Sequence, residues 1–202
     1  MKSSAELKEL AKEQIKGKIG ILFLISLIIS AITFAASSVL SLIPFIGPIA
    51  YEIFIGPAFI LRIIRIYQTV ANFNNPEVSD AFYGFEDFWT AFKALFFVGL
   101  FSFLWGLLFI IPGIIKSYSY SQTMMIVAEN KGIGALDAIN RSKEMMEGHK
   151  ADLFILELSF IGWGILTILT LGIVGIWAIP YMETTLVNFY NEIKPKDVLT
   201  LD

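Results

Sequence analysis

The sequence predicts an all-α membrane protein, with six transmembrane helices in three hairpins broken by proline or glycine and three amphipathic interfacial helices. Uncharged runs recur at 19–51, 94–115 and 158–182, and a bilayer core of roughly 30 Å needs about 20 apolar residues as helix. Hydrophobic residues make up 56% of the 202 positions and charged residues 16%, against about 25% charged in soluble proteins. The two longer runs, 19–51 and 158–182, each also enter a second span.

The chain opens with an amphipathic helix that carries a basic face. Ser3 and Glu6 have the spacing of a capping box, in which each side chain bonds a free backbone N–H at the helix start. Lys8, Lys12 and Lys16 line one side of the helix that follows. We expect this helix to lie on the membrane interface.

The first hairpin follows directly from this helix. Its spans are predicted at 19–42 and 49–66, and Pro44, Gly47 and Pro48 separate them because proline cannot donate the helical hydrogen bond. The second and third hairpins repeat the pattern. Their spans are predicted at 94–111 and 114–127 around Pro112 and Gly113, and at 151–170 and 176–190 around the break 171–175. Gly56 and Pro57 soften the second span of the first hairpin, and Pro180 kinks the sixth span.

The same plan of surface helix, span, break and returning span therefore appears three times. One membrane domain covers 1–202, with pseudo-repeats at about 1–72, 77–130 and 133–194. The second unit opens with aromatic residues at helical spacing from Phe85 to Phe96, and the third with an amphipathic helix after Gly134. These segments complete the three predicted interfacial helices.

The basic residues predict the orientation. Fourteen of the fifteen lysines and arginines lie on the segments that join the hairpins or at the termini, and the three breaks contain none. Because cytoplasmic loops carry the excess of lysine and arginine, both termini are predicted in the cytoplasm, in a multi-pass protein of the cell membrane.

The composition and the motifs exclude several classes of function. The chain has no cysteine, so thiolate metal sites and cysteine nucleophiles are ruled out. A net charge of −3 argues against nucleic acid as a partner, because no dense basic face exists. No zinc, phosphate-loop or serine-hydrolase motif occurs. We therefore predict no enzyme, with no catalytic residue, no cofactor and no metal site.

Three ionisable residues follow the breaks by about one helical turn. Glu52, Lys116 and Glu183 sit on the three returning spans, and charges at membrane depth usually face a bundle interior or a wet cavity. We predict that they converge in a charge cluster near the outer side. The alternative is that each side chain reaches the outer headgroups separately, because one turn is only about 5.4 Å long.

Glu157 is the deepest carboxylate of the predicted fifth span. It is a candidate proton-linked or cation-binding group, or else a partner of Arg62 or Arg65, which enter the membrane from the same side. The polar stretch from Tyr118 to Thr123 on the predicted fourth span has two interpretations as well. It lines a cavity or forms hydrogen bonds between helices.

Several short motifs carry a resemblance to a known family. They are the segment from Ile110 to Lys116 with Phe103-Leu104-Trp105 before it and Tyr118-Ser119-Tyr120-Ser121 after it, then Gly148-His149-Lys150, Leu158 to Trp163, Ile179-Pro180-Tyr181 and Asn188-Phe189-Tyr190. With these motifs the chain resembles domain-of-unknown-function family 975 over nearly its whole length. The resemblance implies a bacterial or archaeal polytopic membrane protein, distantly similar to the membrane portion of glycerophosphodiester phosphodiesterases. It implies no established activity and no catalytic residue.

These observations favour a non-enzymatic integral membrane protein that binds lipid or a partner membrane protein. Surface helices rich in lysine and aromatic residues suit the anionic inner leaflet. The alternative is a small solute or ion transporter, because broken helices around buried charges are how carrier sites are built.

Overall fold

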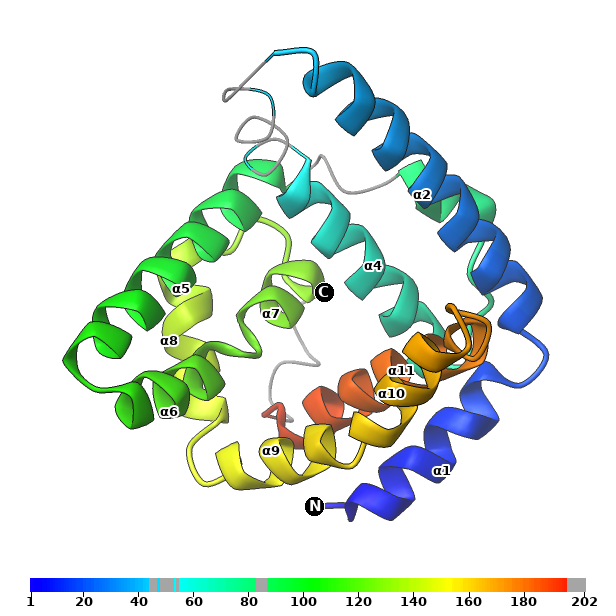
Figure 1. The fold of residues 1–202 in the computed structure, drawn as a ribbon. Coiled ribbons are helices and arrows are strands. Elements are labelled where there is room, and N and C mark those ends of the chain that lie inside the picture. The colour runs from blue at the N-terminus through cyan, green and yellow to red at the C-terminus, as the bar shows by residue number, and fades with distance from the viewer. Residues whose placement is uncertain (44–46, 48–52, 54, 83–86, 196–202) are drawn as a thin grey trace.

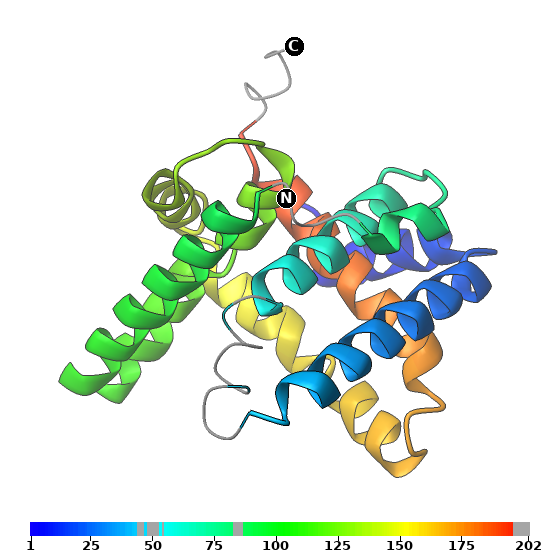
Figure 2. The same ribbon diagram turned by 90° about the horizontal axis from the view of Figure 1, so that it is seen from above.

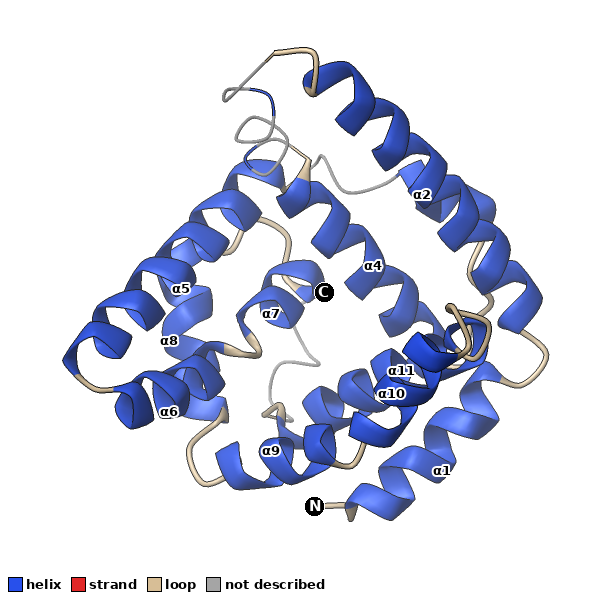
Figure 3. Cartoon of the chain, in the orientation of Figure 1, coloured by secondary structure: helices blue, strands red, loops and turns tan. Residues whose placement is uncertain are grey.

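A computed structural model shows an all-α chain, and it describes residues 1–43, 47, 53, 55–82 and 87–195. Within these residues Figure 3 shows helices joined by loops and no strand. The helices are α1 (Ser4–Ile15), α2 (Ile19–Leu40), α4 (Gly56–Ala71), the short 3-10 helix η1 (Val78–Phe82), α5 (Phe88–Leu108), α6 (Ile110–Tyr120), α7 (Thr123–Glu129), α8 (Ala135–Met145), α9 (Lys150–Leu158), α10 (Ile161–Leu169) and α11 (Gly175–Ile193).

The predicted capping box of the first helix is present. The Ser3 hydroxyl accepts a hydrogen bond from the Glu6 N–H, and the Glu6 carboxylate accepts one from the Ser3 N–H at 2.7 Å. Leu7, Ala11 and Ile15 of α1 are buried. They pack mainly against α11, so the first and last helices of the chain lie together (Figure 1).

The buried part of the protein forms what we call the base: α1, α7 and α8, with the ends of α4, α5 and α11 that pack on them. Two clusters of buried apolar side chains meet in this region, one around α1, α4 and α11 and the other around α4, α7 and α8. The first cluster also extends into the adjoining helices, to Leu22, Ile25 and Ile29 of α2 and to Leu156 and Phe160. Ile139 and Met146 are almost fully enclosed there. The base is thus held together by contacts between buried apolar side chains, as in the core of a helical domain.

Three apolar arms extend from the base, at 19–43, 96–115 and 154–179. Figure 2 shows the far ends of the three arms toward one side, and α1 and α8 toward the other. The segments Ile19–Leu40, Phe88–Leu108 and Lys150–Leu169 are long and apolar enough to cross a membrane. Only 17%, 11% and 17% of these three segments is buried within the protein. Their apolar side chains therefore face outward.

Helices α5 and α6 pack as an antiparallel pair. Phe101 contacts Tyr120, with ring centroids 6.2 Å apart, and a Cβ added at Gly113 would lie 2.8 Å from the Cα of Gly106. The pair turns at Phe109, three residues before the predicted break at Pro112. Proline is compatible with the first turn of a helix, where its missing N–H would be unbonded anyway, so Pro112 sits inside α6.

Helices α10 and α11 form a second antiparallel pair at the predicted place. The chain reverses at Leu171 and Gly172, which both have positive φ, and the Gly172 N–H bonds the Thr167 carbonyl at 2.8 Å. Trp163 contacts Trp177 across the pair, with ring centroids 5.1 Å apart and the rings tilted by 53°. Glycine adopts positive φ without strain, which explains the break here.

The predicted fourth span is interrupted. Helix α6 ends at Tyr120 and α7 begins at Thr123, where the Ser142 hydroxyl of α8 accepts from the Gln122 N–H and donates to the Ser119 carbonyl. This polar stretch therefore makes hydrogen bonds between helices. The second predicted surface helix also differs, because from Phe88 onward its residues are the first turns of α5.

Candidate functional site

A pocket that contains a carboxylate lies between α2, α4 and α11. It has a volume of about 140 Å³, and most of its wall is apolar. Four polar side chains also face it: Ser26, Ser30, Tyr67 and Glu183. The apolar lining residues are Leu22, Ile25, Ile29, Phe59, Ile63, Ile66 and Ile179.

Helical periodicity brings these side chains to one place. On α2 the lining residues repeat at intervals of three and one from Leu22 to Ser30, which traces a single stripe. On α11, Glu183 follows Ile179 by four residues and shares its face, while Tyr67 follows Ile63 by four on α4. Three stripes from three helices thus enclose the pocket.

Two polar groups in the pocket lack ordinary partners. Within the described part of the chain, neither the Glu183 carboxylate nor the Tyr67 hydroxyl makes a hydrogen bond or ion pair, although the two interact electrostatically with each other. Tyr67 is only 6% exposed. The Ser26 hydroxyl differs, because it donates to the Leu22 carbonyl at 2.8 Å. A ligand in the pocket can therefore donate hydrogen bonds to the carboxylate, and it can donate to or accept from the phenol hydroxyl.

The predicted cluster of Glu52, Lys116 and Glu183 is only partly described. Glu52 lies outside the described residues. The Lys116 ammonium lies over the Trp105 ring, 4.9 Å from its centroid, within the α5–α6 pair. Glu183 lines the pocket between three other helices. The structure thus places Lys116 and Glu183 in different surroundings, and no ion pair joins them among the residues described.

The carboxylate and arginines predicted as partners make other contacts. Glu157 accepts a hydrogen bond from the Tyr118 hydroxyl at 2.7 Å. Arg65 forms an ion pair with Asp87, also at 2.7 Å. Arg62, 5% exposed, lines a second pocket of about 420 Å³ between α2 and α4. Glu157 and Arg65 therefore bind different groups.

One lysine of the predicted basic face of α1 contacts another helix, and the other two are exposed. The Lys8 ammonium donates to the Ser159 hydroxyl at 2.5 Å, which ties α1 to the end of α9. Lys12 is exposed and pairs with Glu9 at 2.7 Å on the same helix. Lys16 is exposed and has no ion pair to any described residue. Lys12 and Lys16 are the members of the face that remain open to an outside partner.

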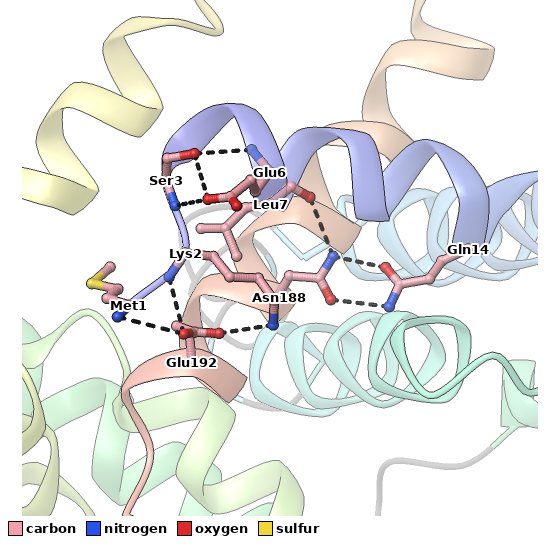
Figure 4. A network of polar contacts seen from close by, with 8 residues as sticks. All are labelled: Met1, Lys2, Ser3, Glu6, Leu7, Gln14, Asn188 and Glu192. Atoms are coloured by element: carbon pink, nitrogen blue, oxygen red, sulfur yellow. Dashed lines mark hydrogen bonds and ion pairs between the residues drawn. The ribbon is translucent and has the colours of Figure 1, made fainter.

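A buried polar clasp holds three helices together (Figure 4). The Gln14 amide donates to the Asn188 carbonyl oxygen at 3.1 Å and receives a hydrogen bond from the Asn188 amide at 2.7 Å. Gln14 also donates to the Ala71 carbonyl at the end of α4. Both amides are almost fully buried. The sequence carried one signal for this contact, because Gln14 lies seven residues after Leu7 and so on its apolar face.

Next to the clasp, the N-terminal segment is tied to the end of α11. Both the N–H and the ammonium of Lys2 donate to the Glu192 carboxylate at 3.0 Å (Figure 4). The hydrogen bond from the Lys2 ammonium lowers the pKa of Glu192. The capping hydrogen bonds from Ser3 lower the pKa of Glu6 in the same way. Both carboxylates are therefore charged at neutral pH.

Among the described residues, no group of three or more histidine, aspartate or glutamate side chains is arranged to hold a metal ion. We therefore take the Glu183 pocket, which places a carboxylate and a phenol in an apolar wall, as the candidate site.

Comparison with protein families identifies the relatives of this chain. The model of the family described as "Protein of unknown function (DUF975)" matches residues 1–119 and 106–197. The chain belongs to this family. Comparison with curated proteins and with solved structures gives no match. Family 975 membership agrees with the resemblance carried by the motifs, and it assigns no activity.

Proposed function

We propose that this family 975 protein is an integral membrane protein that crosses the bilayer six times in three hairpins, to which the three arms belong, with the base on the cytoplasmic leaflet. One observation carries the proposal: three helices of spanning length have at most 17% of their residues buried within the protein. Water disfavours so much contiguous apolar surface, whereas lipid chains do not. The bilayer is the environment that stabilises these arms.

The distribution of charge supports this orientation. The far ends of the arms at 41–43, 107–111 and 168–174 contain no lysine or arginine. The base exposes Lys12 and Lys16 on α1, and Lys93 is exposed at the start of α5. Positive residues favour the cytoplasmic side, so both termini belong there.

We further propose that the base binds anionic lipid and has no enzymatic role. Lysines near a membrane surface contribute about 1 kcal/mol each toward anionic headgroups. Trp89, 64% exposed at the start of α5, has the amphipathic ring that suits the headgroup level. An adjacent partner membrane protein would use the same exposed faces.

Cysteine labelling tests the location, because the natural chain contains no cysteine. Single cysteines replace the exposed Leu42, Phe109 and Leu171 at the ends of the arms, and Lys16 and Leu136 in the base. A membrane-impermeant maleimide is then applied to intact and to permeabilised cells. We expect the three arm positions to be labelled in intact cells, and the two base positions only after permeabilisation.

Two results would contradict the proposed crossings. Labelling of Lys16→Cys in intact cells would reverse the orientation. Arm positions that stay unlabelled in both preparations would mean that the arms end inside the bilayer, because a maleimide in water cannot reach them there.

Anionic lipid binding is tested with the Lys16→Gln variant. We expect native mass spectrometry to show about fivefold weaker retention of phosphatidylglycerol, since one interfacial lysine contributes about 1 kcal/mol. Lys116→Gln is the matched control, because it removes the same charge from α6, outside the base. Equal loss in both variants would show that the base does not hold the lipid.

Transport of a small solute is the second candidate, because Glu183 lines a pocket between α2, α4 and α11. Uptake of methylammonium by proteoliposomes with the natural protein, and its absence with Glu183→Gln, would favour transport over lipid binding.

A further inference from the structure

The pocket between α2, α4 and α11 combines two unpaired polar groups with an apolar wall. The Glu183 carboxylate and the Tyr67 hydroxyl form no hydrogen bond with any other described residue. Tyr67 is 6% exposed and Glu183 is half-buried, so both polar groups are accessible to a ligand that enters the pocket. A carboxylate can only accept, so a group that fits here must bring its own donors.

We propose that this pocket binds a primary alkylammonium group, whose nitrogen donates to Glu183 and Tyr67 and whose carbon chain lies against α2 and α11. The inference rests on the proposed membrane location in one respect: an amphiphile would reach the pocket from the bilayer. A primary ammonium carries three N–H donors, enough for the carboxylate oxygens and the phenol oxygen together. Hydrogen bonds between two charged groups are about twice as strong as neutral ones.

The shape of the site favours an ammonium that carries a chain. Another pocket, of about 180 Å³ and distinct from the one at Arg62, adjoins the Glu183 pocket. Ser26, Tyr67 and Ile179 line both. The adjoining pocket continues along α11 to Gly172 and Gly175, where the wall lacks side chains. The two pockets together form a trough with a carboxylate at one end and apolar walls along its length.

Other classes of ligand fit less well. An anion would be repelled by Glu183, and the lining contains no arginine or lysine. A divalent cation prefers six or more oxygen ligands, whereas this lining offers a single carboxylate. A quaternary ammonium has the charge but no N–H to donate. A primary amine with an aliphatic chain uses both the polar end and the apolar walls.

Binding of octylammonium to the full-length protein in a neutral maltoside detergent tests the proposal. We expect saturable binding in native mass spectrometry, and about tenfold or greater loss of affinity in Glu183→Gln, because a hydrogen-bonded charge is lost. Tyr67→Phe keeps the carboxylate and should weaken binding a few-fold. Octyltrimethylammonium, which lacks N–H donors, should bind at least about tenfold more weakly than octylammonium.

Glu157→Gln is the matched control, because it removes an equal charge from the α9 arm, where Glu157 bonds Tyr118. It should bind octylammonium as the natural protein does. Equal binding by Glu183→Gln and the natural protein would overturn the proposal, and so would equal loss in Glu157→Gln. If Glu183→Gln does not fold, unchanged binding by Tyr67→Phe together with equal binding of the quaternary analogue would overturn it.

The same measurement distinguishes two sources of the ammonium. Preferential retention of phosphatidylethanolamine over phosphatidylcholine with the same acyl chains, lost in Glu183→Gln, identifies a lipid headgroup. Binding of octylammonium without this preference identifies a free lipophilic amine. The cysteine labelling does not depend on either result, so failure of amine binding and failure of the membrane location are separate outcomes.

Discussion

The base and the arms are built from similar helices but have opposite relations to their surroundings. In the base, Ile139 and Met146 are at most 1% exposed. In the arms, Phe103, Leu107 and Ile168 are 63%, 68% and 76% exposed. Burying a large apolar side chain stabilises a structure by about 1.5 to 3 kcal/mol. The base obtains this stabilisation from packing within the protein, whereas the outward side chains of the arms depend on what surrounds them.

Two leucines with nearly the same exposure bring out this difference. Leu104 on α5 is 48% exposed and Leu136 on α8 is 50% exposed. Their accessible surface therefore does not distinguish them. If the arms lie in lipid, the same substitution must have very different effects at the two positions, because only one of them contacts hydrocarbon chains.

The largest predicted effect comes from arginine at these two positions. Leu104→Arg should impair membrane integration by about 2.5 to 3.5 kcal/mol, the range for arginine at the centre of a spanning helix. Leu136→Arg should leave integration unchanged, because water or headgroups solvate the charge. The measurement is the fraction of protein that resists extraction from membranes at alkaline pH. Equal integration of the two variants would mean that α5 does not contact lipid chains.

The sequence predicted the helices better than their ends. The capping box of α1 and the reversal at 171–175 were predicted correctly because both depend on residues close together in the chain. The break at Pro112 was displaced to Phe109, since proline limits a helix only beyond its first turn. The interruption after Tyr120 depends on Ser142 from a distant helix, and no local pattern indicates it.

At the candidate site, too, the sequence indicated single residues better than contacts between distant helices. Glu183 was predicted as a functional residue because a charge inside an apolar stretch is unusual. Its neighbour Tyr67 was not predicted, since an aromatic residue near the end of an apolar helix is common. The predicted convergence with Lys116 relied on pseudo-threefold symmetry, whereas Lys116 contacts Trp105 of the preceding helix. The three repeat boundaries remain a prediction.

A smaller effect is predicted for the polar clasp of the base. Asn188→Ala leaves the Gln14 amide, 2% exposed, without its reciprocal partner, although the bond to the Ala71 carbonyl remains. We expect the free energy of unfolding in detergent to fall by about 2 kcal/mol, because an unsatisfied buried polar group loses about 1 to 3 kcal/mol. Asn140→Ala is the control, since Asn140 is exposed and bonds only Lys143 among the described residues, so its effect should stay within about 0.5 kcal/mol.

The double variant Gln14→Leu, Asn188→Leu separates polarity from packing at this clasp. Removing both amides takes both buried side-chain polar groups away, although the Ala71 and Leu7 carbonyls each lose a hydrogen bond. Side chains of similar volume still fill the space, so the double variant should be more stable than Asn188→Ala. A double variant that is less stable than the single one would show that the amides orient α1 on α11 beyond satisfying each other. The base would then depend on specific hydrogen bonds as well as on apolar burial, whereas, in the part of the chain described, the exposed apolar faces of the arms carry no such buried polar pair.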